Sequence, residues 1–216
     1  MLPNRFGFYQ ILNSRTWFFC SFIWYGINTV MNTLAVNSAS KTKQDSSHLQ
    51  RQVLEWISRY QHEFTHAITF TFNERKVWSF IRASKQLSTP HDERMLELLR
   101  KTMFLFKRNI DHGLYGNTSK RHGARLLFVP VLEGLGVGQF PHYHAAMGVD
   151  NERSKQLGEI VRLSWSKLPF AGHQIKLTPY RDQGWLSYMT KHVLKLNKHV
   201  IDWDSVSIPS RSLATC

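Results

Sequence analysis

Two histidines in the second half of the chain have the spacing of a metal site. His142 and His144 lie two residues apart inside the apolar run 140–148. On a β-strand this spacing places both imidazoles on the same face. Glu133 precedes them across a Gly-rich stretch, and pairing of the flanking strands would bring its carboxylate nearly opposite His142. Two imidazoles and one carboxylate leave coordination positions open for substrate and water, as a catalytic metal site requires.

The net charge of the chain helps to decide whether His142 and His144 form a metal site or have no special role. An isolated His-x-His also occurs on strands whose histidines are only exposed or hydrogen-bonded. Here the chain has 216 residues with 28 Lys and Arg against 15 Asp and Glu, a formal net charge of +13. Because neutralised phosphates release counterions, this charge predicts a polyanionic partner, nucleic acid first and an anionic membrane surface second. Together with Glu133, it favours the metal site.

A tyrosine downstream is placed to act with this group. The last predicted helix covers residues 182–197, and Tyr188, Lys191 and Lys195 fall on its accessible side. Taken alone, Tyr188 could be an ordinary boundary aromatic. A phenol that attacks a phosphodiester, however, needs a metal at the phosphate and a cation against the developing charge, and Lys191 lies one turn away. His192 flanks the same side and could contact DNA. The apolar stripe opposite consists of Leu186, Met189, Val193 and Leu196.

The periodicity of apolar residues predicts the elements that must position these groups. After a first helix, the order β-αα-β-β-α-β-α predicts an α+β fold with an antiparallel ferredoxin-like sheet. Helices are expected on one face of this sheet, with the other face available for a site. Pro130 favours an edge or bulged strand. The predicted strands cover 65–72, 126–132, 140–149 and 173–178, and helices cover 49–60, 77–81, 90–106, 150–165 and 182–197.

Composition divides the chain into three parts. Residues 1–46 are an N-terminal hydrophobic extension and polar linker, residues 47–200 the domain, and residues 201–216 a C-terminal tail. The stretch 16–25 resembles the hydrophobic region of a signal peptide but is too short to span a membrane. An upstream extension with the functional start at Met31 is favoured over a packing or a targeting segment. The cysteines form no framework, which fits a cytoplasmic location.

A second motif competes for the metal. The sequence from His62 to His66 fits the H-E-x-x-H pattern of zinc peptidases, whose two histidines lie one helical turn apart. Thr65 begins an alternating run of β-branched and aromatic residues, so His66 is expected on a strand and the imidazoles should diverge. A helix running past residue 70 would favour the peptidase instead.

Taken in order, the motifs resemble those of rolling-circle replication initiators of the HUH endonuclease superfamily, plasmid and phage type. The resemblance covers residues 64–197. Residues 68–72 are similar to the first motif, Glu133 with residues 141–144 to the metal motif, and residues 188–191 to the Tyr-x-x-Lys motif. It implies an endonuclease that nicks single-stranded origin DNA through attack by Tyr188, with a 5′-phosphotyrosine link and a free 3′-OH. It also implies Mg²⁺ or Mn²⁺, although two imidazoles equally suit zinc or iron.

The resemblance has further implications for partners and alternatives. No helicase domain is recognisable, so a host helicase and polymerase are the expected partners, and no membrane is expected. The last motif has a single tyrosine, which argues against a two-tyrosine strand-transfer cycle. Relaxases and single-strand transposases share the same chemistry and remain alternatives. An alternative of another class is a DNA-binding regulator without nuclease activity.

Overall fold

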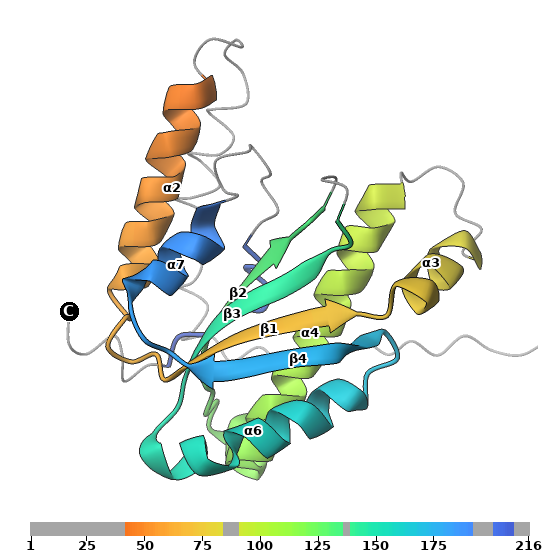
Figure 1. Ribbon diagram of the computed structural model, residues 1–216. Helices are drawn as coiled ribbons and strands as arrows, with labels where there is room; N and C mark the ends of the chain where they lie inside the picture. The colour runs from red at the N-terminus through yellow and green to blue at the C-terminus, as the bar shows by residue number, and fades with distance from the viewer. Residues whose placement is uncertain (1–41, 84–90, 136–138, 192–200, 210–216) are drawn as a thin grey trace, which may run out of the picture. The chain divides into compact units, whose positions relative to one another are not determined.

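A computed structural model describes residues 42–83, 91–135, 139–191 and 201–209 (Figure 1). The chain divides into two units, residues 1–45 and residues 46–216, and the second contains all four described strands. This unit has an α+β architecture built on one four-stranded antiparallel sheet. No described helix is long and apolar enough to cross a membrane.

The sheet has the strand order β2-β3-β1-β4, and every neighbouring pair is antiparallel. The strands are β1 His66–Phe72, β2 Leu127–Glu133, β3 His142–Gly148 and β4 Ala171–Pro179. All four predicted strands are therefore confirmed, with ends that differ by at most two residues from those expected. Pro130 lies on the edge strand β2, as predicted, where a missing backbone N–H does not break a central ladder.

Helices α4 His91–Tyr115 and α6 Asn151–Ser166 cover one face of the sheet and form the larger core with it (Figure 1). Helix α3 Glu74–Ala83 follows the end of β1 and adds Val77 and Ile81 to this core. Alternation along the strands sends Phe70, Phe128 and Tyr143 into this core, where they are fully buried. Helix α6 begins as predicted, because the Asp150 side chain accepts a hydrogen bond from the backbone N–H of Arg153 at 2.9 Å.

The second face of the sheet is partly covered as well, which corrects the expectation of helices on one face only. Helices α2 Thr42–Ser58 and α7 Gln183–Thr190 contribute to a second core with β2 and β3. The reason is visible in β2, which is apolar on both faces and therefore needs cover on both. This core contains Val53, Ile57, Leu127, Val129, Val131, Ala146, Leu186, Met189 and Ile201.

The structure differs from the prediction in two further segment boundaries, in one additional element, and in α4, which runs nine residues past the predicted end at residue 106. Residues 42–46, expected as polar linker, belong to α2. Residues 201–208, expected as part of a tail, lie along the outer edge of β2, with bridges from Ser207 to Phe128 and from Ile201 to Val131. An edge strand offers unpaired backbone groups, and this segment binds some of them. The five-residue helix α5, Asn117–Arg121, was not predicted because it buries no side chain.

Asp202 anchors the C-terminal segment to the middle of the sheet. It is fully buried, and its Oδ2 accepts hydrogen bonds from the Tyr143 hydroxyl at 2.9 Å and the Ser205 hydroxyl at 3.1 Å. Burial raises the pKa of Asp202 to about 6, against the opposing effect of these two hydrogen bonds. Since Tyr143 stands between His142 and His144, residues 201–208 support the strand that carries both histidines.

A buried ion pair joins α4 to the beginning of β2. Lys107 Nζ lies 2.6 Å from Asp111 Oδ2, and Asp111 Oδ1 accepts a hydrogen bond from the backbone N–H of Leu126 at 3.1 Å. Burial lowers the pKa of Lys107, and the nearby charge of Asp111 opposes this effect. Removal of Asp111 would leave the ammonium buried without its counter-charge. We expect Asp111→Ala to lower the free energy of unfolding by about 3–5 kcal/mol, measured by urea denaturation.

The same helix contains a matched control for this prediction. Lys101 Nζ and Glu97 Oε1 are also 2.6 Å apart with the same i,i+4 spacing, but their side chains are 71% and 64% exposed. Because exposed pairs contribute little, Glu97→Ala should change the free energy of unfolding by less than about 1 kcal/mol. Equal losses in the two variants would contradict a special role for the buried pair.

Candidate metal centre

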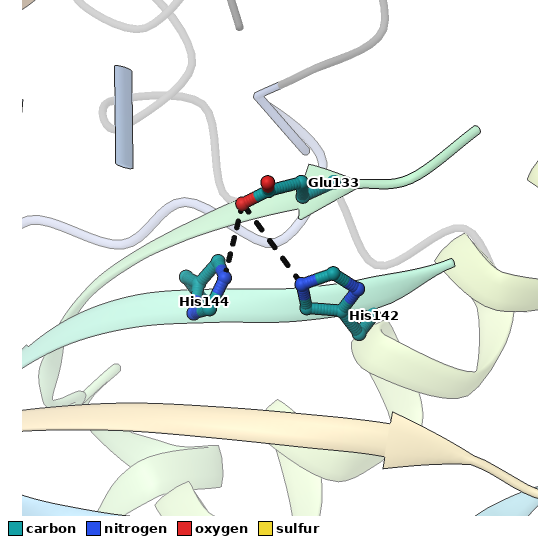
Figure 2. Close-up of side chains that lie close together, drawn as sticks. All are labelled: Glu133, His142 and His144. Atoms are coloured by element: carbon teal, nitrogen blue, oxygen red, sulfur yellow. Dashed lines mark ion pairs between the residues drawn. The ribbon is translucent and has the colours of Figure 1, made fainter. Parts of the chain in front are cut away.

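Strands β2 and β3 bring the three predicted metal ligands together. Glu133 is the register partner of His142, as expected from pairing across the intervening turn. Its Oε2 lies 3.1 Å from His144 Nε2 and 3.9 Å from His142 Nε2 (Figure 2). One ligand atom from each of the three residues lies within 4.8 Å of the others. The group could therefore hold a metal ion.

In both histidines, the ring nitrogen Nδ1 has a hydrogen-bond partner on the side away from Glu133. His144 Nδ1 lies 2.9 Å from the Thr69 hydroxyl, and His142 Nδ1 lies 3.3 Å from the Phe140 carbonyl oxygen. Hydrogen bonds of this kind orient metal-binding imidazoles and leave Nε2 for the metal. Buried His144 Nε2 makes no hydrogen bond within the described part of the chain, in spite of its short distance to Glu133. This donor set fits a divalent cation.

The protonation state of His144 suits a metal ligand. Burial and the neighbouring His142 together lower its pKa to about 4, although the charge of Glu133 opposes the shift. The imidazole is therefore neutral at neutral pH, and neutral imidazole is the form that binds metals.

Lys191 has a partner that the sequence did not indicate. Its Nζ lies 3.2 Å from Glu133 Oε1. The lysine therefore contacts one of the candidate metal ligands in addition to Tyr188. Burial opposes the charged form of Lys191, but its contacts with Tyr188 and Glu133 prevail and raise its pKa. The ammonium thus compensates the carboxylate and remains charged at neutral pH.

Helix α7 presents Tyr188 beside this group. The Asp182 side chain caps the helix by accepting a hydrogen bond from the Gly184 N–H at 2.8 Å. Leu186 and Met189 are buried, whereas Tyr188 is 42% exposed, which confirms the predicted accessible side. The Tyr188 ring centroid lies 5.3 Å from that of His144, and Lys191 Nζ lies 3.6 Å from the Tyr188 centroid.

Two further residues of the site were missed by sequence reasoning. The Trp185 ring stacks on Tyr188 with centroids 5.6 Å apart and also lies 5.4 Å from His144. Its position three residues before Tyr188 on the same helix was the available signal. Thr69 could be found only from the register of β1 and β3, in which it is the partner of His144. The proposed DNA-binding residues His192 and Lys195, and the stripe residues Val193 and Leu196, lie outside the described residues.

The competing H-E-x-x-H motif does not form a site. Helix α2 ends at Ser58 and His66 begins β1, so His62 and His66 are not one turn apart on a helix. Among the described residues, the group Glu133, His142 and His144 is the only cluster of three or more candidate ligands. The geometry thus contradicts the zinc-peptidase interpretation.

Comparisons with protein-family models, curated proteins and solved structures found no match. The class of site therefore follows from the geometry alone. It is a candidate metal centre on a sheet face, flanked by an exposed tyrosine and a lysine that contacts both the tyrosine and the metal group.

Proposed function

We propose that this chain is an endonuclease that nicks single-stranded DNA at a replication origin and initiates rolling-circle replication. The observation that carries the proposal is the exposed Tyr188, whose ring lies 5.3 Å from that of the candidate ligand His144. A nucleophile at this position can reach a phosphate held at the candidate metal centre. The formal net charge of +13 supports a polyanionic substrate.

The proposed reaction is a transesterification at phosphorus. The Tyr188 oxygen forms a bond to the scissile phosphorus and loses its proton to solvent. The bond from phosphorus to the 3′-oxygen breaks, and this oxygen takes a proton from water to become a free 3′-OH. The product is DNA joined to Tyr188 through its 5′-phosphate, so the energy of the phosphodiester is retained.

The neighbouring side chains have separate tasks in this reaction. Glu133, His142 and His144 would hold Mg²⁺ or Mn²⁺, which would polarise the scissile phosphate. Lys191, at 3.6 Å from the Tyr188 ring centroid, stabilises negative charge on the phenolic oxygen as the proton leaves. Trp185 stacks on the tyrosine ring and limits its rotation.

The proposal includes a cytoplasmic location, with a host helicase that unwinds the DNA and a polymerase that extends the 3′-OH. Relaxases and single-strand transposases would use the same arrangement of metal and tyrosine. The proposed chemical step is common to all three uses.

A pool of random-sequence single-stranded oligonucleotides tests the chemical step without knowledge of the origin. We expect Mn²⁺ or Mg²⁺ to yield protein–DNA adducts that survive SDS, and sequencing of the bound DNA should identify the preferred site. Peptide mass spectrometry should place the nucleotide on Tyr188. Adducts that still form in EDTA, or cleavage by hydrolysis without an adduct, would contradict the mechanism. DNA binding without cleavage would instead support the regulator.

A further inference from the structure

A cavity separate from the candidate metal centre lies where β1 pairs with β4. This cavity of about 700 Å³ is lined by residues 71–76 and 172–174, where the end of β1 meets the start of β4 and α3 begins. Figure 1 shows α3 following directly from β1 beside β4. None of the proposed catalytic residues lines this cavity.

Most of the titratable side chains that line the cavity are basic. Arg75, Lys76 and His173 are exposed and line it, and Glu74 is its single acidic residue. The side chain of Asn73 accepts a hydrogen bond from the Lys76 N–H at 3.1 Å, which fixes the first turn of α3 at the cavity wall. The backbone N–H groups of a helix start add to the positive potential. This chemistry suits an anion with several oxygens.

One backbone position beside the cavity has no room for a side chain. The register of β1 and β4 shifts between Phe70 and Phe72, which marks an irregularity in the ladder. At Gly172, a Cβ would lie 2.4 Å from the Thr71 carbonyl oxygen, so only glycine allows this close approach. The Thr71 hydroxyl donates to the Gln174 carbonyl oxygen at 3.2 Å across the same pair of strands.

The cavity lies close to the candidate metal centre. Thr71 lines the cavity and is the register partner of the metal-site residue His142. Because neighbouring strands are about 4.8 Å apart, β4 lies roughly 10 Å from β3 on the same sheet. Lys176, the register partner of Thr69, is exposed on β4 two residues after the cavity residue Gln174 and adds a positive charge near the cavity. The cavity and the metal group therefore lie on neighbouring strands of one sheet.

We propose that this cavity binds backbone phosphates of the single strand next to the phosphate that is cleaved. The inference rests on the proposed function, since it concerns the same DNA strand. Arg75 and Lys76 neutralise these phosphates, and they hold the strand across β1 so that its scissile phosphate lies at the metal group. The cavity recognises charge and not base identity, because phosphate contacts position a nucleic acid without reading its sequence.

The first experiment measures binding of fluorescein-labelled dT20 in EDTA, where no cleavage takes place. We expect the double substitution Arg75→Ala and Lys76→Ala to weaken binding about tenfold at low salt. The slope of log K against log salt should fall by about 1.4, since each neutralised single-strand phosphate contributes about 0.7. Circular dichroism and Mn²⁺ titration should show an unchanged fold and metal centre.

The control removes the same two charge types from a helix that does not line the cavity. Lys155 and Arg162 are exposed on α6, and neither is among the residues that line the cavity. Lys155→Ala with Arg162→Ala should retain nearly wild-type affinity and salt slope. Equal losses in both double variants would show that only net charge matters, and they would overturn the cavity site. Wild-type affinity in the Arg75 and Lys76 variant, or no binding of dT20 by the wild type, would overturn it as well.

A second experiment locates the contact relative to the nick. In an oligonucleotide that forms the adduct, a neutral methylphosphonate within a few nucleotides of the nick should weaken wild-type binding, but not binding by the Arg75 and Lys76 variant. If the methylphosphonate and the Arg75 and Lys76 substitutions each weakened DNA binding independently of the other, the inference would be overturned. Failure of the proposed function is recognised separately: the wild type then binds dT20 through the cavity but forms no adduct with the random pool.

Discussion

Tyr188→Phe is expected to abolish formation of the covalent protein–DNA adduct, a loss of roughly 10⁴-fold or more, as for removal of other catalytic nucleophiles. The substitution deletes one hydroxyl from a side chain that is 42% exposed, so the fold should not change. Phenylalanine keeps the ring that contacts Lys191 and stacks on Trp185. Since Tyr188 is not among the candidate ligands, Mn²⁺ affinity should remain. Denaturing gels and calorimetric titration measure the two quantities on the same preparation.

Tyr180→Phe is the matched control, because it deletes the same hydroxyl from a residue outside the site. The Tyr180 ring packs against Phe64 with centroids 5.5 Å apart, and its hydroxyl is buried without a hydrogen-bond partner in the described part of the chain. This variant should form adducts at the wild-type rate. A nucleotide found on Tyr180 or Tyr143 by mass spectrometry, or adducts that persist in Tyr188→Phe, would assign the nucleophile elsewhere.

His144→Ala is expected to remove both metal binding and metal-dependent cleavage. Loss of a hydrogen-bonding partner outside the ligand shell lowers metal affinity about 10–100-fold, and loss of a ligand should lower it further, by more than about 100-fold. His142→Ala should behave in the same way. Binding of dT20 should change little, since the proposed phosphate contacts are on other residues. Calorimetric Mn²⁺ titration and the adduct assay measure the two losses.

Two variants sharpen this test. Thr69→Val removes the hydroxyl that lies 2.9 Å from His144 Nδ1 and should produce the intermediate loss of metal affinity. His66→Ala removes a histidine of the competing motif, which is not part of the ligand group, and should leave metal affinity unchanged. Cleavage in EDTA, or wild-type metal affinity after loss of His144, would contradict the assignment of the metal centre.

The resemblance in motifs and the geometry of the site support the same proposal in different ways. The motifs connect Glu133, His142, His144 and Tyr188 with one chemistry. The structure adds that Lys191 contacts both Glu133 and Tyr188, which links the charge of the metal group to the nucleophile. This link predicts that Lys191 affects the metal centre as well as the chemical step.

The sequence by itself determined the features that depend on neighbours along the chain. Alternation of apolar residues indicated the strands, and helical periodicity indicated the exposed position of Tyr188 opposite Leu186 and Met189. The pairing of Glu133 with His142 was predictable because consecutive strands joined by a Gly-rich connection usually pair as antiparallel neighbours, with the end of one strand opposite the start of the next. The three candidate metal ligands could therefore be predicted from rules about neighbouring residues and consecutive strands.

The tertiary structure alone decided which distant segments meet. The register that places Thr69 beside His144, and the contact between Lys191 and Glu133, join residues far apart in the sequence. The same holds for α2 and residues 201–208, which cover the second face and outer edge of β2. Periodicity shows that a face is apolar but not what covers it, because that choice depends on which packing buries the most surface across the whole fold. The basic cavity was likewise decided by the tertiary structure, because the irregular register and the close approach at Gly172 exist only once β4 pairs with β1.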